Sequence, residues 1–267
     1  MTTSGTDRWS SGRAYESYVG RWSRLVAPEF LAWLEIRPGR RWLDVGCGTG
    51  ALTDAILTQC DPSSVVGVDP SETFVLHARA SVVDDRATFV VGPAASTGLD
   101  DCELDVVVSG LVLNFVPDLG EALAEARRVV NPGGVVAGYV WDYDDGMQLM
   151  RHFWDAAVAL EPAAQALDEG TRFESTRPGP LAASFTAAGL DAVEVRAVEV
   201  PTVFVDFDDF WTPFLGGTGT APSYVASLTE SARNALRERL RATIATELDG
   251  SIRMVARAWA VQGRRSE

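Results

Sequence analysis

Three glycines and two acidic residues near the start of the chain have the types and spacing of a ligand-binding loop. Gly46, Gly48 and Gly50 lie between a short apolar run and a helical pattern, and Asp44 precedes the first of them by two residues. Glycines let the backbone approach a ligand closely, and a helix N-terminus presents free N–H groups. Nineteen residues after Gly50, at the end of the next apolar run, stands Asp69, whose carboxylate could accept both hydroxyls of a ribose. The spacing therefore predicts a bound nucleotide.

Two kinds of nucleotide cofactor fit this loop, a dinucleotide and S-adenosylmethionine (SAM). Gly46, Gly48 and Ala51 satisfy the dinucleotide fingerprint, so that pattern alone leaves an NAD(P)-dependent oxidoreductase on a Rossmann fold as an alternative. Asp44 favours SAM, because a carboxylate in the mouth of the loop repels a pyrophosphate but attracts a methionine ammonium. The surrounding segment 42–125 carries two arginines and fourteen acidic residues, which suits a sulfonium cation better than a diphosphate.

The composition excludes several other kinds of chemistry. The chain has 267 residues and a formal net charge of −14, and all 23 of its cationic residues are arginines. Without lysine it cannot form a Schiff base, a Walker-A phosphate loop or the Tyr-x-x-x-Lys pair of a reductase. Its acidic balance argues against nucleic acid or an anionic membrane as the main partner.

Cysteine content and hydropathy bear on the cellular setting. Three scattered cysteines, Cys47, Cys60 and Cys102, predict neither a disulfide framework nor a metal site. No run approaches 18 apolar residues, and residues 1–12 are polar, without the apolar stretch of a signal peptide. We therefore expect a cytoplasmic protein without a metal or a membrane partner.

Short apolar strands alternate with helical patterns through the first half of the chain. Strands are predicted over residues 41–45, 64–68, 87–91, 104–109 and 135–141, and helices over 25–36, 51–58, 71–81 and 118–130. Valine-rich strands that alternate with helices are typical of a parallel sheet covered on both faces. The second half predicts helices over 147–167, 181–188 and 229–248, strands over 193–205 and 251–261, an aromatic and acidic segment over 206–214 and a loop over 216–222.

Five motifs occur in a fixed order along this first half. They are Leu43-Asp-Val-Gly-Cys-Gly-Thr-Gly50, Gly67-Val-Asp-Pro-Ser71, Leu104-Asp-Val-Val-Val-Ser109, Leu113-Asn-Phe-Val-Pro-Asp118 and Asn131-Pro-Gly-Gly134, preceded by Tyr15-Glu-Ser-Tyr-Val-Gly-Arg-Trp-Ser23. The series resembles the class I SAM-dependent methyltransferases, specifically the type-11-like bacterial branch that acts on small molecules. The resemblance spans residues 15–141 and continues only in outline beyond them.

The resemblance implies a fold and a domain organisation. It implies an α/β, doubly wound, seven-stranded Rossmann-like sheet with N-terminal helices and an α-helical lid inserted in the C-terminal half. The chain is then a single methyltransferase domain with these parts: a disordered segment 1–12, N-terminal capping helices 13–37, a SAM-binding core 38–141, lid inserts 142–177 and 206–249, and remaining core elements 178–205 and 250–262.

The resemblance also implies cofactor contacts, residue by residue. Asp44 would face the methionine ammonium, Asp69 would hold the ribose, and Pro70 and Ser71 would lie beside the adenine. The remaining contacts would come from Gly46, Cys47, Gly48, Gly50, Ser109, Tyr15 and Arg21. Pro93 stands where the family usually has an acid for the adenine amino group, so the N–H of Ala94 or the hydroxyl of Ser96 would replace that contact.

Methyl transfer from a sulfonium is an in-line displacement that depends mainly on holding the acceptor close and aligned. A general base is needed only if the acceptor is protonated, and the sequence offers no obvious catalytic pair. Candidates for a base or an acceptor contact are His152 and Asn114, and candidates for the wall of the acceptor site are Trp141, Tyr143, Trp154 and Trp211. The expected partner is a small-molecule methyl acceptor, the expected assembly a monomer or homodimer, and a SAM-binding protein without turnover is the third alternative.

Overall fold

The computed structural model describes residues 21–216 and 219–267, and the chain divides into two compact units. The nucleotide-fold unit comprises residues 24–140, 175–198 and 258–267. The aromatic unit comprises the described residues of 1–23 together with 141–174 and 199–257. Each unit is described separately below.

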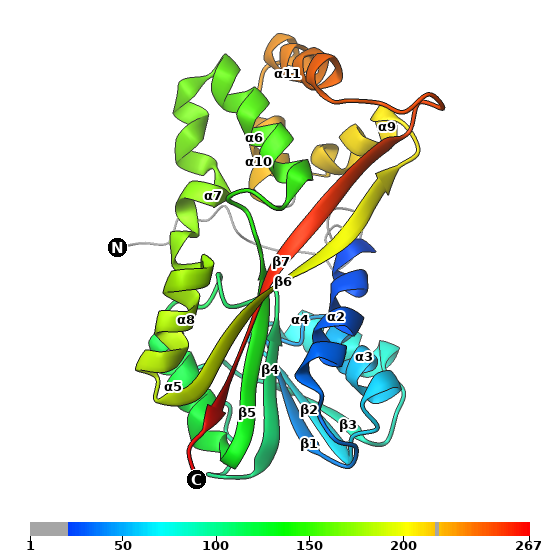
Figure 1. Cartoon of the computed structure of the whole chain (residues 1–267). Helices are drawn as coiled ribbons and strands as arrows, with labels where there is room; N and C mark the ends of the chain where they lie inside the picture. The colour runs from blue at the N-terminus through cyan, green and yellow to red at the C-terminus, as the bar shows by residue number, and fades with distance from the viewer. Residues whose placement is uncertain (1–20, 217–218) are drawn as a thin grey trace. The chain divides into compact units, whose positions relative to one another are not determined.

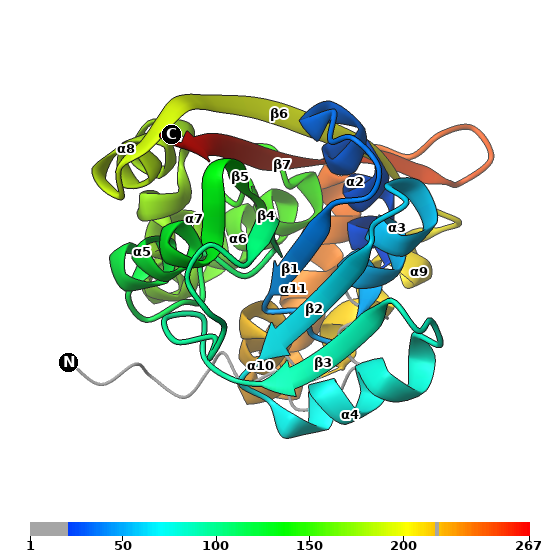
Figure 2. The same ribbon diagram turned by 90° about the horizontal axis from the view of Figure 1, so that it is seen from below.

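The nucleotide-fold unit contains the parallel strands that the alternating pattern predicts. They are β1 (Arg41–Val45), β2 (Ser64–Asp69), β3 (Ala87–Val91), β4 (Leu104–Gly110) and β5 (Val130–Trp141), the last of which ends at the first residue of the other unit. β1 pairs in parallel with β2 and β4, β2 with β3, and β4 with β5. Figures 1 and 2 show these strands side by side in the order β3-β2-β1-β4-β5.

Two long strands complete the sheet. β6 (Leu190–Phe204) and β7 (Ile252–Arg265) each contribute residues to both units, and the full order is β3-β2-β1-β4-β5-β7-β6. The chain leaves β1 toward β2 on one side, and β4 lies on the other. The direction of winding therefore reverses at β1, and ligands of doubly wound sheets bind at the carboxyl ends of the strands beside such a reversal.

Helices with identifiable caps connect the strands. α3 (Ala51–Gln59) follows the glycine loop, α4 (Glu72–Ser81) begins after Ser71, and α5 (Leu119–Val129) begins after Asp118. Ser71 Oγ accepts the Phe74 N–H, and Asp118 Oδ1 accepts the Glu121 N–H, as N-cap residues do. α2 (Arg21–Leu34) and α8 (Pro178–Ala187) complete the helices that supply residues to this unit.

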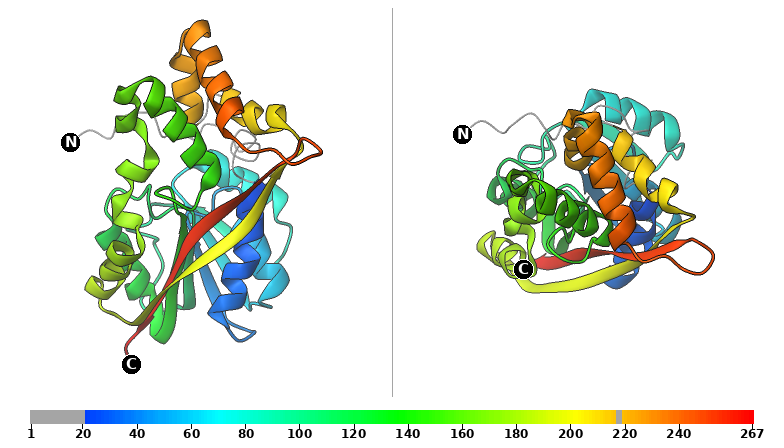
Figure 3. Two further views of the ribbon diagram at one scale, coloured as in Figure 1. Left: turned by 45° about the horizontal axis from the view of Figure 1, so that its top comes forward. Right: turned by 90° about the horizontal axis from the view of Figure 1, so that it is seen from above.

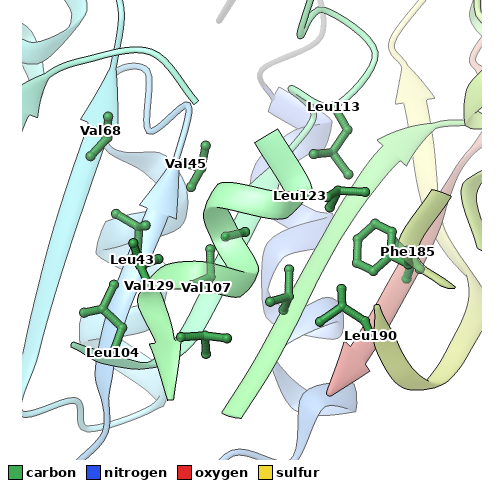
Figure 4. Close-up of a cluster of buried hydrophobic side chains, with 14 of the residues drawn as sticks. Leu43, Val45, Val68, Leu104, Val107, Leu113, Leu123, Val129, Phe185 and Leu190 are labelled. Carbon is green, nitrogen blue, oxygen red and sulfur yellow. The ribbon is translucent and has the colours of Figure 1, made fainter. Parts of the chain in front are cut away.

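One continuous apolar core holds the nucleotide-fold unit together. Leu43 and Val107 from the sheet, Leu123 from α5 and Phe185 from α8 are members of the same buried cluster. Figure 4 shows these side chains converging with Leu190 at the start of β6. Fully burying a side chain of this size stabilises a fold by roughly 1.5–3 kcal/mol, so this cluster fixes the strand ends that carry the candidate site.

The aromatic unit is mainly helical (Figure 3). Its elements are α6 (Gln148–Leu160), η2 (Pro162–Leu167), α7 (Glu169–Arg172), α9 (Phe207–Trp211), η4 (Thr212–Leu215), α10 (Thr220–Ser227) and α11 (Glu230–Thr243), with η3 (Glu174–Thr176) where the chain passes back to the other unit. Phe153 stacks on Phe214 with ring centroids 4.5 Å apart and meets Trp154 edge to face at 5.0 Å. Offset and edge-to-face contacts of this kind add about 0.5–1.5 kcal/mol per pair.

The doubly wound α/β class is confirmed, while several predicted boundaries are wrong. The helix predicted over 147–167 ends at Leu160, because Pro162 cannot continue its hydrogen bonding and a 3₁₀ turn follows. β5 begins at Val130 rather than 135, and a register irregularity between Leu104 and Val106 accommodates the additional residues.

Other corrections concern element ends. The predicted loop 216–222 already contains the first turn of α10 from Thr220, the helix predicted to reach residue 248 ends at Thr243, and the last strand continues to Arg265. No helix among the described residues is long and apolar enough to cross a membrane. The division into one domain with lid inserts over 142–177 and 206–249 stays a prediction.

Glu125 on α5 anchors the segment that follows β3. Its Oε1 accepts the N–H of Thr97 at 2.8 Å and the Thr97 hydroxyl at 2.7 Å, and its Oε2 accepts Arg128 Nε at 2.7 Å. These hydrogen bonds, that from Arg128 foremost, hold the pKa of Glu125 at about 2. A buried carboxylate thereby ties a surface loop to the core.

We expect Glu125→Gln to lower the free energy of unfolding by about 1–3 kcal/mol at pH 7, because it removes a charged acceptor from two buried donors. The folded-state pKa lies below the ordinary value of 4.5. The stabilisation is therefore complete above pH 4.5 and is lost as the pH falls toward 2. Urea unfolding of both proteins at several pH values measures this, with the exposed Glu121→Gln on the same helix as control. A difference that is independent of pH would contradict the assignment.

Candidate functional site

The glycine loop is folded back onto the end of β2. The N–H groups of Gly46 and Cys47 both donate to Val68 O, at 2.7 and 3.1 Å, and Gly50 N–H donates to Cys47 O at 2.8 Å. Gly46, Gly48 and Gly50 have φ values of +75°, +52° and +92°, a region that residues with a Cβ adopt only at a cost. The loop conformation therefore requires glycine at these positions.

Asp69 links the glycine loop to the start of α4. Its Oδ2 accepts the Gly48 N–H at 3.0 Å, and its Oδ1 accepts the Ser71 N–H at 2.8 Å. Burial raises the pKa of Asp69 against the opposing effect of these two donors. Each carboxylate oxygen has a second lone pair, so Asp69 can hold the loop and still accept two hydroxyl groups of a ligand.

Asp44 is a buried carboxylate in which only one of the two oxygens accepts a hydrogen bond from a described residue. Its Oδ2 accepts the Thr53 hydroxyl at 2.7 Å, whereas its Oδ1 is buried and has no hydrogen-bond partner among the described residues. Desolvation raises its pKa to about 7, against the Thr53 hydrogen bond and with a smaller contribution from Asp69. A buried charged oxygen without a donor is costly, and a cationic donor such as an ammonium would satisfy it.

The side chains of two further predicted residues, Ser109 and Cys47, make structural contacts within the fold. The buried Ser109 hydroxyl donates to Val45 O at 2.9 Å and so ties β4 to β1. Cys47 is buried beneath Gly67, where an added Cβ would lie 3.0 Å from its Sγ, and burial raises the pKa of its thiol. The backbone of Cys47 belongs to the loop, but its side chain fills the core.

The segment after β4 packs directly against the glycine loop. An added Cβ at Gly46 would lie 2.6 Å from both methyl groups of Val112. Leu111, just before it, has a φ of +61°, and its N–H donates to Tyr139 O at 2.8 Å. This strained turn leads to Asn114, whose Nδ2 is buried without a hydrogen-bond partner among the described residues. Sequence patterns did not indicate Leu111 or Val112, because neither residue type marks such a turn.

The predicted adenine-side residues lie at the ends of β2 and β3. Pro70 is exposed and Ser71 caps α4. Ala94 is half-buried in the turn that follows β3, where Pro93 is exposed. Tyr15 lies outside the described residues, and so does the side chain of Arg21, the first residue of α2. Asp44, the glycine loop, Asp69, Ser71, Ser109 and Asn114 are all brought together in the nucleotide-fold unit.

Apart from Asn114, the predicted acceptor-side residues belong to the aromatic unit. They are Trp141, Tyr143, His152, Trp154 and Trp211. Trp154 is buried and its Nε1 donates to Glu169, and burial raises the pKa of Glu169 to about 7. Burial lowers the pKa of the half-buried His152. No group of His, Cys, Asp and Glu side chains suited to a metal ion occurs among residues 21–216 and 219–267.

Comparison with known proteins agrees with this geometry. Residues 43–138 match the family described as a methyltransferase domain. A 2-methyl-6-phytyl-1,4-hydroquinone methyltransferase of Synechocystis is 30% identical over 177 residues, which cover 65% of this chain and 54% of the relative. A demethylmenaquinone methyltransferase of Symbiobacterium thermophilum is 37% identical over 121 residues, 43% of this chain and 48% of the relative. The chain thus spans about half the length of the curated relatives it matches.

Solved structures share the fold. The YcgJ protein of Bacillus subtilis superposes with a TM-score of 0.60 at 19% identity, over 90% of this chain and 98% of that one. A phosphoethanolamine N-methyltransferase of Haemonchus contortus, solved with S-adenosylhomocysteine, gives a TM-score of 0.59 at 16% identity, over 96% of this chain and 57% of that one.

The fold, the glycine loop with its two acidic residues and the family match lead to one conclusion. Residues 43–138 match the methyltransferase-domain family, and the chain shares its fold with solved methyltransferases.

Proposed function

We propose that this protein transfers the methyl group of SAM to a small-molecule acceptor. The observation that carries the proposal is the partnerless buried oxygen of Asp44 beside a glycine loop that Asp69 holds in place. The ammonium of SAM supplies a cationic donor for Asp44, and its ribose hydroxyls supply donors for the remaining lone pairs of Asp69. The glycine loop lets the methionine portion lie against the backbone.

SAM, when bound, supplies an activated methyl group on a sulfonium whose departure leaves a neutral thioether. The protein's part is to hold the acceptor in line with that methyl group, which accounts for most of the catalysis in such a displacement. We assign Asn114 to the acceptor side of the site, because its buried Nδ2 has a donor to offer. The hydroquinone and demethylmenaquinone methyltransferases among the relatives support an apolar or aromatic acceptor.

The remaining proposals concern partners and setting. We propose a cytoplasmic enzyme that works as a monomer or homodimer, without a nucleic-acid substrate. The net charge of −14 supports the last point, since nucleic-acid binding requires basic surfaces.

Calorimetry with SAM, S-adenosylhomocysteine, NAD and NADP tests the proposed cofactor. Binding of the first two without the last two is the expected result, because a pyrophosphate would approach the buried Asp44 carboxylate. NAD or NADP binding without SAM binding would instead support the oxidoreductase alternative. A panel of hydroxylated aromatic and quinol acceptors, assayed for product methylation, then separates turnover from binding alone.

We expect Asp69→Asn to weaken S-adenosylhomocysteine binding by roughly 10- to 100-fold, because a neutral amide replaces a charged acceptor of the ribose hydroxyls. Asp54→Asn, at an exposed position on α3, is the matched control and should leave the affinity unchanged. Isothermal titration of the three proteins measures the difference. Equal affinities for the Asp69 variant and the unaltered protein would place the ribose elsewhere.

We expect the affinity for S-adenosylhomocysteine to rise as the pH increases from 6 to 7.5, since only ionised Asp44, whose pKa is about 7, attracts the ammonium. The gain approaches the ratio of the ionised fractions, about eightfold. Asp44→Asn removes the titrating group and should bind weakly with a flat profile. The same pH slope in both proteins would assign the dependence to another group.

The ligand-free protein should respond in the opposite sense. The pKa of Asp44 is raised above its ordinary value of 3.8, so its contribution to stability is complete below pH 3.8 and is lost as the pH rises through about 7. Asp44→Asn should therefore be relatively more stable than the unaltered protein at pH 8 than at pH 5. Thermal unfolding without ligand at both pH values provides the measurement.

A further inference from the structure

The sheet ends at β6, which has a neighbouring strand on one side only. β6 is the last strand in the sheet order, next to β7, and Figure 2 shows it at the margin of the sheet. In the nucleotide-fold unit this edge comprises residues 190–198. No backbone group of residues 193–197 is hydrogen-bonded to a described residue outside the sheet. An edge with a row of unpaired N–H and C=O groups is a template for another strand.

The two faces of this edge differ in chemistry. Val193 and Val195 pack against the apolar core cluster, and the exposed Ala197 follows on the same face by the alternation of a strand. Glu194 and Arg196 lie on the opposite face, where both line a groove beside α2. The edge therefore presents an apolar row on one face and two opposite charges on the other.

A second copy of the chain complements this edge. If two β6 strands run antiparallel about a two-fold axis at Val195, each Glu194 faces Arg196 of the second copy. Val195 then faces its own equivalent, and Val193 faces Ala197 on the apolar face. Opposite charges that face each other across two strands stabilise a sheet, and the symmetry provides this pair twice.

Both charged side chains are available for such pairs. Glu194 accepts only Gln262 Nε2, at 3.3 Å, and the side chain of Arg196 has no hydrogen bond or ion pair to any described residue. Other registers are unfavourable. An axis at Glu194 or at Arg196 places a charge opposite its own equivalent, which destabilises a sheet. An axis midway between two residues brings the apolar face of one copy beside the charged face of the other.

The ladder is limited to residues 193–197. Ala192 has a φ of +49°, which interrupts the strand geometry, and by symmetry it ends the ladder at both ends. The acidic residues beyond it have partners of their own, since Asp191 accepts the Ser266 hydroxyl and Glu199 pairs with Arg257. A ladder of this length predicts a dimer that dissociates reversibly.

We propose that two copies of this protein associate through their β6 edges, antiparallel about Val195, with Glu194–Arg196 ion pairs on one face and apolar contacts on the other. The sheet then continues from one copy into the other. This inference concerns the assembly of the proposed enzyme and is independent of its cofactor.

Analytical ultracentrifugation of the full chain over a range of micromolar concentrations tests the proposal. The unaltered protein should show a reversible equilibrium of monomer and dimer. Arg196→Glu should raise the dissociation constant by about tenfold or more, because both ion pairs are lost and like charges then face each other. A monomer at every concentration, or an unchanged dissociation constant in Arg196→Glu, overturns the proposal.

Exchanging the two charges provides a matched control. Glu194→Arg should weaken association as well, whereas the double variant Glu194→Arg/Arg196→Glu restores opposite charges and should return the dissociation constant to within about threefold of the original. Arg239→Glu, at an exposed position on α11, makes the same change in net charge as Arg196→Glu and should leave association unaltered. A double variant that stays as weak as the single variants overturns the assignment of these pairs.

Introduced cysteines test the register. The two copies of Val195 lie opposite each other, at a Cα separation of about 4.5–5.5 Å that a disulfide can span. Val195→Cys should therefore form a covalent dimer under mild oxidation. Ala197→Cys should not, because it faces Val193 of the second copy. The unaltered protein, with its three native cysteines, is the control. Cross-linking of Ala197→Cys but not of Val195→Cys overturns the register.

These outcomes are distinct from those of the proposed function. A monomeric protein that binds S-adenosylhomocysteine supports the function and overturns the inference. A dimer with the stated charge dependence that does not bind S-adenosylhomocysteine supports the inference and contradicts the function. Circular dichroism establishes that each variant is folded before its association is compared.

Discussion

The carboxylate of Asp69 is the interaction on which the site depends. One of its oxygens accepts from the glycine loop and the other from the residue that caps α4. Two segments that leave neighbouring strands are thereby fixed by one side chain at the end of β2. Because a carboxylate is acceptor-only when ionised, every group that it can recruit is a donor, and the site is correspondingly suited to the hydroxyl groups of a sugar.

Asp44 illustrates the cost of preparing such a site before the ligand arrives. A buried carboxylate with a pKa of about 7 is partly neutral near physiological pH. Its ionisation destabilises the ligand-free fold, and a cationic ligand beside it would offset that cost. The neighbouring Thr53 hydroxyl satisfies only one of the two oxygens. An apolar residue at this position would pack without that penalty, but it would offer nothing to a cation. The fold therefore keeps a local instability at Asp44.

Local sequence signals were sufficient for strands β1 to β4, the glycine loop and the starts of α4 and α5, because each depends on residues close together in the chain. Asp69 was predictable because its distance from the loop reflects one helix and one strand. The contact between Gly46 and Val112 was not, since it depends on a left-handed φ at Leu111 that leucine does not announce. Nor did anything near Glu125 or Glu169 indicate burial: acidic residues on helices are usually solvated, and only tertiary packing encloses these two.

The contact between the glycine loop and Val112 has an evolutionary consequence. A β carbon at Gly46 is excluded both by its φ of +75° and by the two methyl groups of Val112, so the side chain at position 112 must fit against a fixed glycine. Replacing Val112 by a side chain of another shape alters the surface that the glycine loop packs against. Residue 112 therefore affects the loop although it carries no polar group. Divergence at residue 112 is thus constrained by epistasis with the glycine loop. Libraries that randomise residues 111–114 should therefore restrict position 112 to side chains that fit against the glycine loop.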